Sequence, residues 1–172
     1  MLGGENIGSR DVALTVGFAG LYAVLVIVLA PISFELVQVR VADALIPLSM
    51  IFGWPAIIGV SVGCAIANVV SPMPSVVVDI IFGSLANFVA SFLAWKISSF
   101  KKRNTVLEFL GCVAATLTIT LIVGTYLAVL TGMEVWLWWL GIGVGSVISV
   151  CGIGFTLIQV LKRVLHESFK FS

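Results

Sequence analysis

A small set of polar side chains lies inside long apolar stretches of this 172-residue chain, and these side chains are the first candidates for chemistry. Polar groups in apolar surroundings are costly, and at membrane depth they commonly mark a binding site or a transport pathway. Most of them fall in one half of the chain. The set consists of Glu35, Gln38, Arg40, Asp43, Asn68, Asp79, Asn87 and Glu134.

Asp79, Gly83 and Asn87 are spaced four residues apart, so a helix places them on one face. Gly83 has no side chain, which leaves room for a flat ligand to approach the backbone. Two interpretations of Asp79 stay open: a structural ion pair with Arg40, or a carboxylate that accepts N–H groups of a ligand. Asn68, at the end of the preceding apolar run, and Asn87 serve either as ligand-binding amides or as hydrogen-bonding contacts between helices.

Arg40 and Asp43 are three residues apart at the start of an expected helix. They form either a local ion pair, favoured by the positive helix N-terminus, or a pair that orients a polar solute. Gln38 and Glu35 precede them in a mixed segment. That segment is either a solvated loop or a cap over the same solute.

The composition points to a membrane protein. Apolar residues make up 60% of the chain and charged residues only 10%, whereas soluble domains are typically about 45–50% apolar and about 25% charged. The net charge of +1 argues against nucleic-acid binding, which needs a basic surplus. A span takes roughly 20 residues, so the chain accommodates about five to seven spans and no separate soluble domain.

The sequence offers little for catalysis or metal binding. It contains no phosphate-binding G-x-x-x-x-G-K-[ST] loop and no H-E-x-x-H motif. Its single histidine, His166, lies in the polar tail, and Cys64, Cys112 and Cys151 lack metal-ligand spacing. We therefore expect neither an enzyme, nor a cofactor, nor a metal site.

The apolar runs predict a single transmembrane domain over residues 1–172, an all-α bundle of six helices. Gly53-Trp54-Pro55 interrupts a run of 30 apolar residues, and Pro55 disfavours helical geometry at Trp54. We therefore expect two short helices there, joined by a tight turn. The six expected helices cover 12–32, 41–52, 55–70, 76–95, 105–130 and 135–161.

Positive charge predicts the orientation of the bundle. Lys96, Lys101, Lys102 and Arg103 lie between the fourth and fifth expected helices, and Lys162, Arg163 and Lys170 lie in the tail. Loops rich in Lys and Arg stay in the cytoplasm. We therefore expect both termini inside, with the connection at 71–75 outside.

Small residues recur at intervals of four in the first expected helix, for example Ala19 and Ala23. Such rows allow helices to approach closely. They serve either packing within the bundle or, for a helix at its edge, docking of an external partner.

Three motifs resemble a known family. A-P-I-S-F at 30–34, Q-V-R-V-A-D-A-L at 38–45 and D-I-I-F-G-S-L-A at 79–86 are similar to the QueT family. This family comprises substrate-binding S components of energy-coupling factor (ECF) transporters, assigned to queuosine precursors. The resemblance is clear over residues 12–97; the rest matches only in length and hydropathy. Asp43 stands where the family more often has Glu.

The resemblance implies a six-helix S-component bundle in the cell membrane, with both ends cytoplasmic and an outer binding site. It also implies partners, namely a transmembrane coupling subunit and two ATPase subunits, with Ala19 and Ala23 on the docking face. The expected ligand is a 7-deazaguanine base. Asp79 supplies a carboxylate to it, Arg40 orients the site, and the amides come from Gln38, Asn68 and Asn87. The alternatives are an S component for another vitamin and a membrane scaffold protein that carries no solute.

Overall fold

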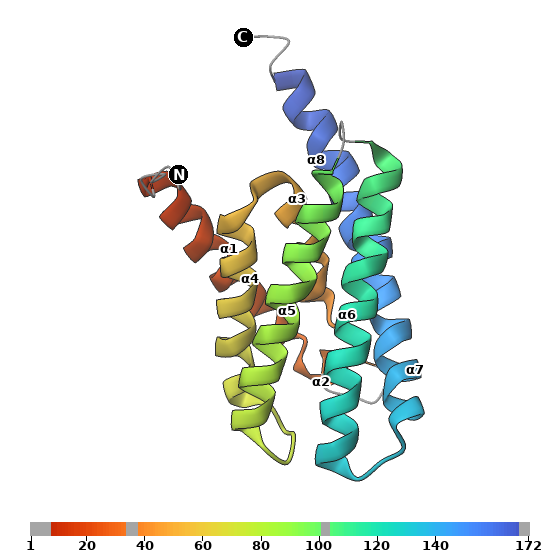
Figure 1. Ribbon diagram of the computed structural model, residues 1–172. Helices are drawn as coiled ribbons and strands as arrows, with labels where there is room; N and C mark the ends of the chain where they lie inside the picture. Colours follow the sequence, from red (N-terminus) through yellow and green to blue (C-terminus); the bar gives the residue numbers. More distant parts are fainter. Residues whose placement is uncertain (1–7, 34–37, 101–103, 169–172) are drawn as a thin grey trace, which may run out of the picture.

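The computed structural model describes residues 8–33, 38–100 and 104–168 (Figure 1). These residues form helices joined by short connections and contain no strand. Glu35 and the basic residues 101–103 lie outside the described residues. In chain order, the elements are α1 (Ser9–Val28), α2 (Ala30–Ser33), η1 (Val41–Leu48), α3 (Ser49–Phe52), α4 (Trp54–Ala67), η2 (Asn68–Val70), α5 (Val76–Ser98), α6 (Thr105–Thr131), α7 (Val135–Ser146), η3 (Val147–Gly154) and α8 (Phe155–Ser168).

Four helical stretches are long and apolar enough to cross a membrane: Ser9–Val28, Val76–Ser98, Thr105–Thr131 and Val135–Leu165. Two shorter apolar stretches, Val41–Phe52 and Trp54–Val70, lie between the first and second of these. The chain is thus an all-α protein of the membrane class, and the count of six spans stays a prediction.

The bundle has two distinct ends (Figure 1). The start of α1, the turn between α3 and α4, the end of α5, the start of α6 and the end of α8 lie at one end, which we call the terminal end. The connections at 71–75 and 132–134 lie at the opposite end, the loop end. This grouping matches the one expected from the basic residues, whose placement in the cytoplasm remains a prediction.

The first helix is shorter than expected. The sequence predicts one helix over 12–32, but α1 ends at Val28, and a separate turn of helix, α2, runs over Ala30–Ser33. The break falls at Leu29, two residues before Pro31. Pro31 has no N–H and therefore cannot donate the backbone hydrogen bond that would continue α1 past Leu29, which accounts for a boundary here.

The stretch 41–70 contains two short helical arms that meet at a turn. Gly53 has φ +63°, a left-handed conformation that favours glycine, and Pro55 occupies the first turn of α4. The break therefore lies where the sequence places it. The first arm differs from expectation, because Val41–Leu48 is a 3₁₀-helix rather than an α-helix. Pro47 lies inside it and removes one backbone donor.

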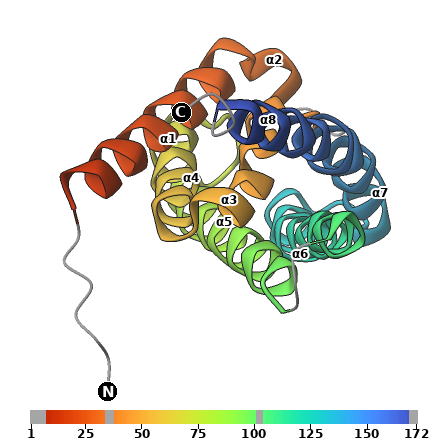
Figure 2. The same ribbon diagram turned by 90° about the horizontal axis from the view of Figure 1, so that it is seen from above.

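η1 is the central element of the bundle. It contacts α1, α4, α5, α6, η3 and α8. In the view along the bundle, α3 lies inside the ring formed by the surrounding helices (Figure 2). Residues 42–47 are all buried. A polar residue on η1 is therefore held within the protein rather than at the lipid surface.

Glycines allow the closest approaches between helices. A Cβ at Gly63 would lie 2.6 Å from the backbone oxygen of Ala19, and one at Gly59 would lie 2.5 Å from Cβ of Phe18. These contacts bring α4 against α1. A Cβ at Gly145 would lie only 1.7 Å from the backbone oxygen of Gln38. The segment before η1 is therefore seated on α7.

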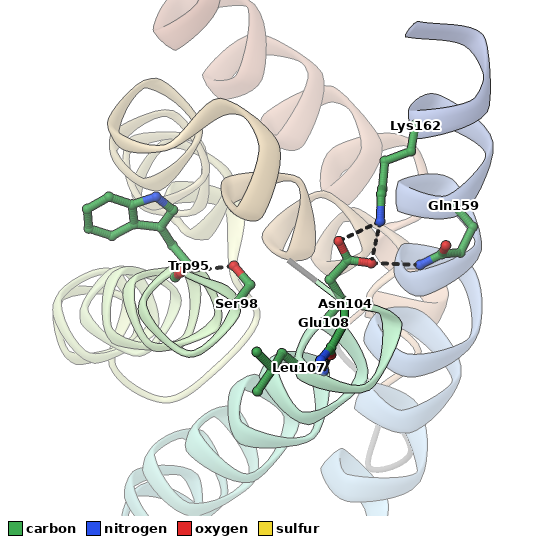
Figure 3. Close-up of polar contacts among 7 residues, drawn as sticks. All are labelled: Trp95, Ser98, Asn104, Leu107, Glu108, Gln159 and Lys162. Atoms are coloured by element: carbon green, nitrogen blue, oxygen red, sulfur yellow. Dashed lines mark hydrogen bonds and ion pairs between the residues drawn. The ribbon is translucent and has the colours of Figure 1, made fainter. Parts of the chain in front are cut away.

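The last span is a single long helix with a π-helical centre, η3. At its terminal end, α8 is tied to α6 by a buried carboxylate (Figure 3). Glu108, which is 1% exposed, accepts hydrogen bonds from Lys162 Nζ at 2.8 Å and Gln159 Nε2 at 3.0 Å. This polar contact was not expected from the sequence.

Candidate functional site

Two carboxylates buried between the helices are each held by a tyrosine. The hydroxyl of Tyr22 on α1 donates to Oδ1 of Asp43 on η1 at 2.5 Å. The hydroxyl of Tyr126 on α6 donates to Oδ1 of Asp79 on α5. All four side chains are less than 9% exposed. A buried carboxylate needs such donors, because its desolvation is otherwise uncompensated.

Cys64 and Asn68 connect Arg40 to Asp79. Nη1 of Arg40 lies 3.7 Å from Sγ of Cys64, and Nδ2 of Asn68 lies at the same distance from that sulfur. Nδ2 of Asn68 also donates to the backbone oxygen of Asp79 at 2.9 Å. Contacts between side chains therefore join α4, η2 and α5 to the segment before η1.

Gly83 makes room for Asn68. A Cβ at position 83 would lie 2.5 Å from Nδ2 of Asn68, 3.5 Å from Sγ of Cys64 and 3.6 Å from the Tyr126 hydroxyl. From the sequence alone, the space beside Gly83 is expected to accommodate a flat ligand. In the structure the amide of Asn68 occupies it, so Gly83 contributes by accommodating that amide.

Three buried polar atoms in this region have no hydrogen-bond partner among the described residues. They are Oδ1 of Asn68, Oδ2 of Asp79 and Nδ2 of Asn87. Asn68 is fully buried, and the other two residues are 1% and 2% exposed. Unsatisfied buried polar groups are rare and costly, so these three atoms mark the region as a candidate binding site. Two are acceptors, and the third is a donor.

The structure brings four of the seven expected ligand-binding residues into one contact network: Arg40, Asn68, Asp79 and Gly83. Asp43 is joined to it through its backbone N–H, which donates to the backbone oxygen of Arg40 at 2.9 Å. Asn87 follows Gly83 on the same face of α5 and is buried, but no side-chain contact in the described part of the chain joins it to the others. Gln38 is also buried, with its backbone against Gly145. The contact seen at the Asp79 carboxylate is the Tyr126 hydroxyl, not the Arg40 guanidinium considered from the sequence.

Sequence reasoning missed three members of this network. Tyr22 and Tyr126 are the only tyrosines in the chain, and both lie in apolar spans. That was an available signal, because a buried tyrosine hydroxyl needs a hydrogen-bond partner. Cys64 was interpreted as a small packing residue. The structure agrees that it is fully buried and adds that two N–H donors reach its sulfur.

Ala19 and Ala23, the expected docking residues, are 8% and 6% exposed. The backbone of Ala19 lies against Gly63 of α4, within the same chain. A different face of α1 is exposed, and the glycines Gly17 and Gly20 have open space around them. Docking through Ala19 and Ala23 would thus require α1 to separate from α4.

The site is suited to recognition of a polar solute. It offers carboxylate and amide groups at fixed positions inside an apolar bundle, the arrangement typical of small-molecule sites. Within residues 8–33, 38–100 and 104–168, no group of three His, Cys, Asp or Glu residues could hold a metal ion. The fold and the site together define a multi-pass membrane protein with a polar site buried between its helices.

Comparison with protein families identifies the class more narrowly. The family model described as QueT transporter matches residues 12–163. The chain therefore belongs to the QueT transporter family, and the resemblance seen in its motifs is confirmed. Comparison with curated proteins and with solved structures gave no match. Family membership makes the chain a transporter component, which suggests transport rather than catalysis as its role.

Proposed function

We propose that the chain is the substrate-capture (S) subunit of an ECF-type importer and binds a 7-deazaguanine base, a queuosine precursor. It takes up the base at the loop end, on the outer side of the cell membrane, with both termini in the cytoplasm. Family membership and the buried polar network support a role in solute capture. The motifs at 30–45 and 79–86 support the choice of ligand.

The observation that carries this proposal is the trio of unpartnered atoms on Asn68, Asp79 and Asn87. A 7-deazaguanine is flat and carries N–H donors beside a carbonyl on one edge. Oδ2 of Asp79 and Oδ1 of Asn68 are open acceptors for those donors, and Nδ2 of Asn87 is an open donor for the carbonyl. The ligand thus supplies both kinds of partner that these three atoms lack.

The position of the site within the spans fits capture from the loop end. Asp79 lies in the first turn of α5, and Tyr126 lies in the last two turns of α6. Both positions are near the connections at 71–75 and 132–134. Asn68 follows α4 directly, at the same end. Arg40 and Gln38 lie in the segment that leads into the centre of the bundle, where they orient the base and contribute an amide.

Energy for release on the inner side comes from partners. The sequence has no phosphate-cradling loop of its own. A transmembrane coupling subunit and two ATPase subunits supply this function in the proposed complex. The bilayer is the remaining partner, since the outward faces of the helices are apolar.

The direct test is binding by the purified chain in lipid nanodiscs. We expect isothermal titration to detect 7-deazaguanine binding at one site, and mass spectrometry of the extracted protein to find a base of this type. If the extract contains a different vitamin and titration shows no binding of 7-deazaguanine, the proposed S-component role stands but the proposed ligand is wrong. The absence of any bound solute in both measurements would support the scaffold alternative.

A further inference from the structure

The hydroxyl of Tyr126 makes a contact that the proposed function does not use. It donates to Oδ1 of Asp79 and leaves Oδ2 of the same carboxylate without a partner among the described residues. Oδ1 is thus hydrogen-bonded within the protein, whereas Oδ2 is available to accept a hydrogen bond from a ligand. An ionised carboxylate is an all-acceptor group, so its orientation decides which ligand donors it can meet.

The ring that carries this hydroxyl packs against another aromatic ring, and the helix that carries it is hydrogen-bonded to α7. The aromatic rings of Tyr126 and Phe82 pack with centroids 5.7 Å apart and planes inclined by 33°. On the neighbouring residue of α6, Oγ1 of Thr125 accepts a hydrogen bond from Nε1 of Trp139 at 3.2 Å. These contacts fix both the ring and the helix segment from which it extends.

Gly83 completes the arrangement from the side of α5. A Cβ there would lie 3.6 Å from the Tyr126 hydroxyl, which is ordinary van der Waals contact. The hydroxyl therefore lies against the backbone of α5, one helical turn from Asp79. The side chain is 8% exposed, so little water competes for its proton.

We propose that Tyr126 is a specificity-determining positioning residue: it orients the Asp79 carboxylate so that Oδ2 meets the amine-bearing edge of the base. This inference rests on the proposed function. Tyr126 acts through Asp79. Its hydroxyl sets the orientation of the carboxylate, and that orientation determines how strongly the protein prefers one base over a related one. A base that lacks the exocyclic amine offers one donor fewer to the oriented carboxylate and binds more weakly.

The test compares two bases, 7-deazaguanine and 7-deazahypoxanthine, which differ by that amine. Titration of each into wild type and Tyr126→Phe gives a ratio of the two affinities. We expect the substitution to weaken 7-deazaguanine binding by about ten- to a hundredfold, as loss of a hydrogen bond to a charged group predicts. We expect a smaller effect on 7-deazahypoxanthine, so that the ratio falls.

Thr116→Val is the matched control, because it removes another buried hydroxyl from α6, one that lies beside Cys151. We expect it to leave the ratio at the wild-type value. A purely structural role for Tyr126 predicts a lower melting temperature with both bases weakened equally. An unchanged ratio in Tyr126→Phe, whatever the absolute affinities, would overturn the proposal.

Phe82→Leu provides a second variant in case Tyr126→Phe does not fold. Phe82 is 41% exposed, so the substitution keeps an apolar surface and removes only the ring contact that aligns Tyr126. We expect the ratio to fall partway, and a wild-type ratio in a folded Phe82→Leu would then overturn the proposal. If wild type binds neither base, the proposed ligand itself is wrong, which separates that failure from the failure of the Tyr126 inference.

Discussion

Glu108 of α6 and Lys162 of α8, which are 54 residues apart in the sequence, form an ion pair with Nζ 2.8 Å from Oε1. The glutamate is 1% exposed, whereas the lysine side chain is 35% exposed. A buried carboxylate is thus matched with a partner that reaches it from the surface. The contact fixes the end of the last helix against the start of α6.

Replacing the cation should destabilise the bundle. Lys162→Met leaves Glu108 buried, and Gln159 is then its remaining side-chain donor among the described residues. Partial exposure of the lysine reduces the effect, so we expect a loss of about 1–2 kcal/mol rather than that of a fully buried pair. Thermal unfolding in detergent measures it as a lower melting temperature. Arg163→Met, at an exposed neighbouring position, is the control and should leave the melting temperature unchanged.

Asp79→Asn tests the ligand carboxylate. The substitution preserves size but replaces one acceptor by a donor that faces a ligand N–H. We expect a loss of about 2–4 kcal/mol in binding, or roughly 30- to 1,000-fold in affinity for 7-deazaguanine. Titration calorimetry beside a melting curve measures both effects. Near-native affinity with a lowered melting temperature would leave Asp79 with a structural role only.

Gly83→Ala tests the accommodation of Asn68. The added Cβ would lie 2.5 Å from Nδ2 of Asn68 and should displace that amide from the backbone oxygen of Asp79. We expect weaker ligand binding and a lower melting temperature. Adding Asn68→Ala should restore much of the stability but not the binding. Gly17→Ala, which has open space around it, is the control. Equal melting temperatures for Gly83→Ala and this control would contradict the prediction, because they would show that Asn68 accommodates the added Cβ without loss of stability.

Ala19→Leu tests what the small residues of α1 do. The backbone of Ala19 lies against Gly63, and its side chain is nearly buried, so added volume should push α1 away from α4. We expect a lower melting temperature of the isolated subunit. Gly17→Leu, on the exposed side of the same helix, should leave it unchanged. A stable Ala19→Leu chain that binds ligand normally but fails in uptake with the ATPase module would instead support docking through Ala19.

The proposed orientation is testable with a cysteine introduced at Lys102. Lys102 lies outside the described residues, but the helices before and after it are described: the end of α5 and the start of α6 lie at the terminal end, with the start of α1. In a background without native cysteines, a membrane-impermeant maleimide added to intact cells should not label Lys102→Cys. Pro72→Cys, which is exposed at the loop end, should be labelled. The reverse pattern would place the site on the inner side.

The sequence predicts the membrane class, the break at Gly53 and the single face that carries Asp79, Gly83 and Asn87. These features follow from local properties, namely hydropathy, turn chemistry and helical periodicity. The 3₁₀ geometry of Val41–Leu48 does not follow in this way. It depends on packing from several sides, as at Gly154, where a Cβ would lie 2.9 Å from the backbone oxygen of Ala44.

Contacts between residues that are far apart in the sequence cannot be predicted from local sequence properties either. Tyr22 and Tyr126 have sequence neighbours typical of lipid-facing helices, and only the fold brings their hydroxyls to Asp43 and Asp79. Glu108 lies in the first turn of α6, a position where an acidic residue is commonplace at a helix start. Its burial depends on α8, which is supplied by a distant part of the chain.

The central position of η1 has a consequence for biogenesis. A translocon recognises stretches of roughly 20 apolar residues, and neither Val41–Phe52 nor Trp54–Val70 reaches that length. These two short stretches must therefore enter the bilayer together, as a hairpin that turns at Gly53. η3, which packs against η1, is synthesised only after α5, α6 and α7. Until η3 is in place, the η1 segment that carries Asp43 lacks part of its protein surroundings, so a chain that ends before η3 leaves this polar segment incompletely shielded from lipid, which is costly.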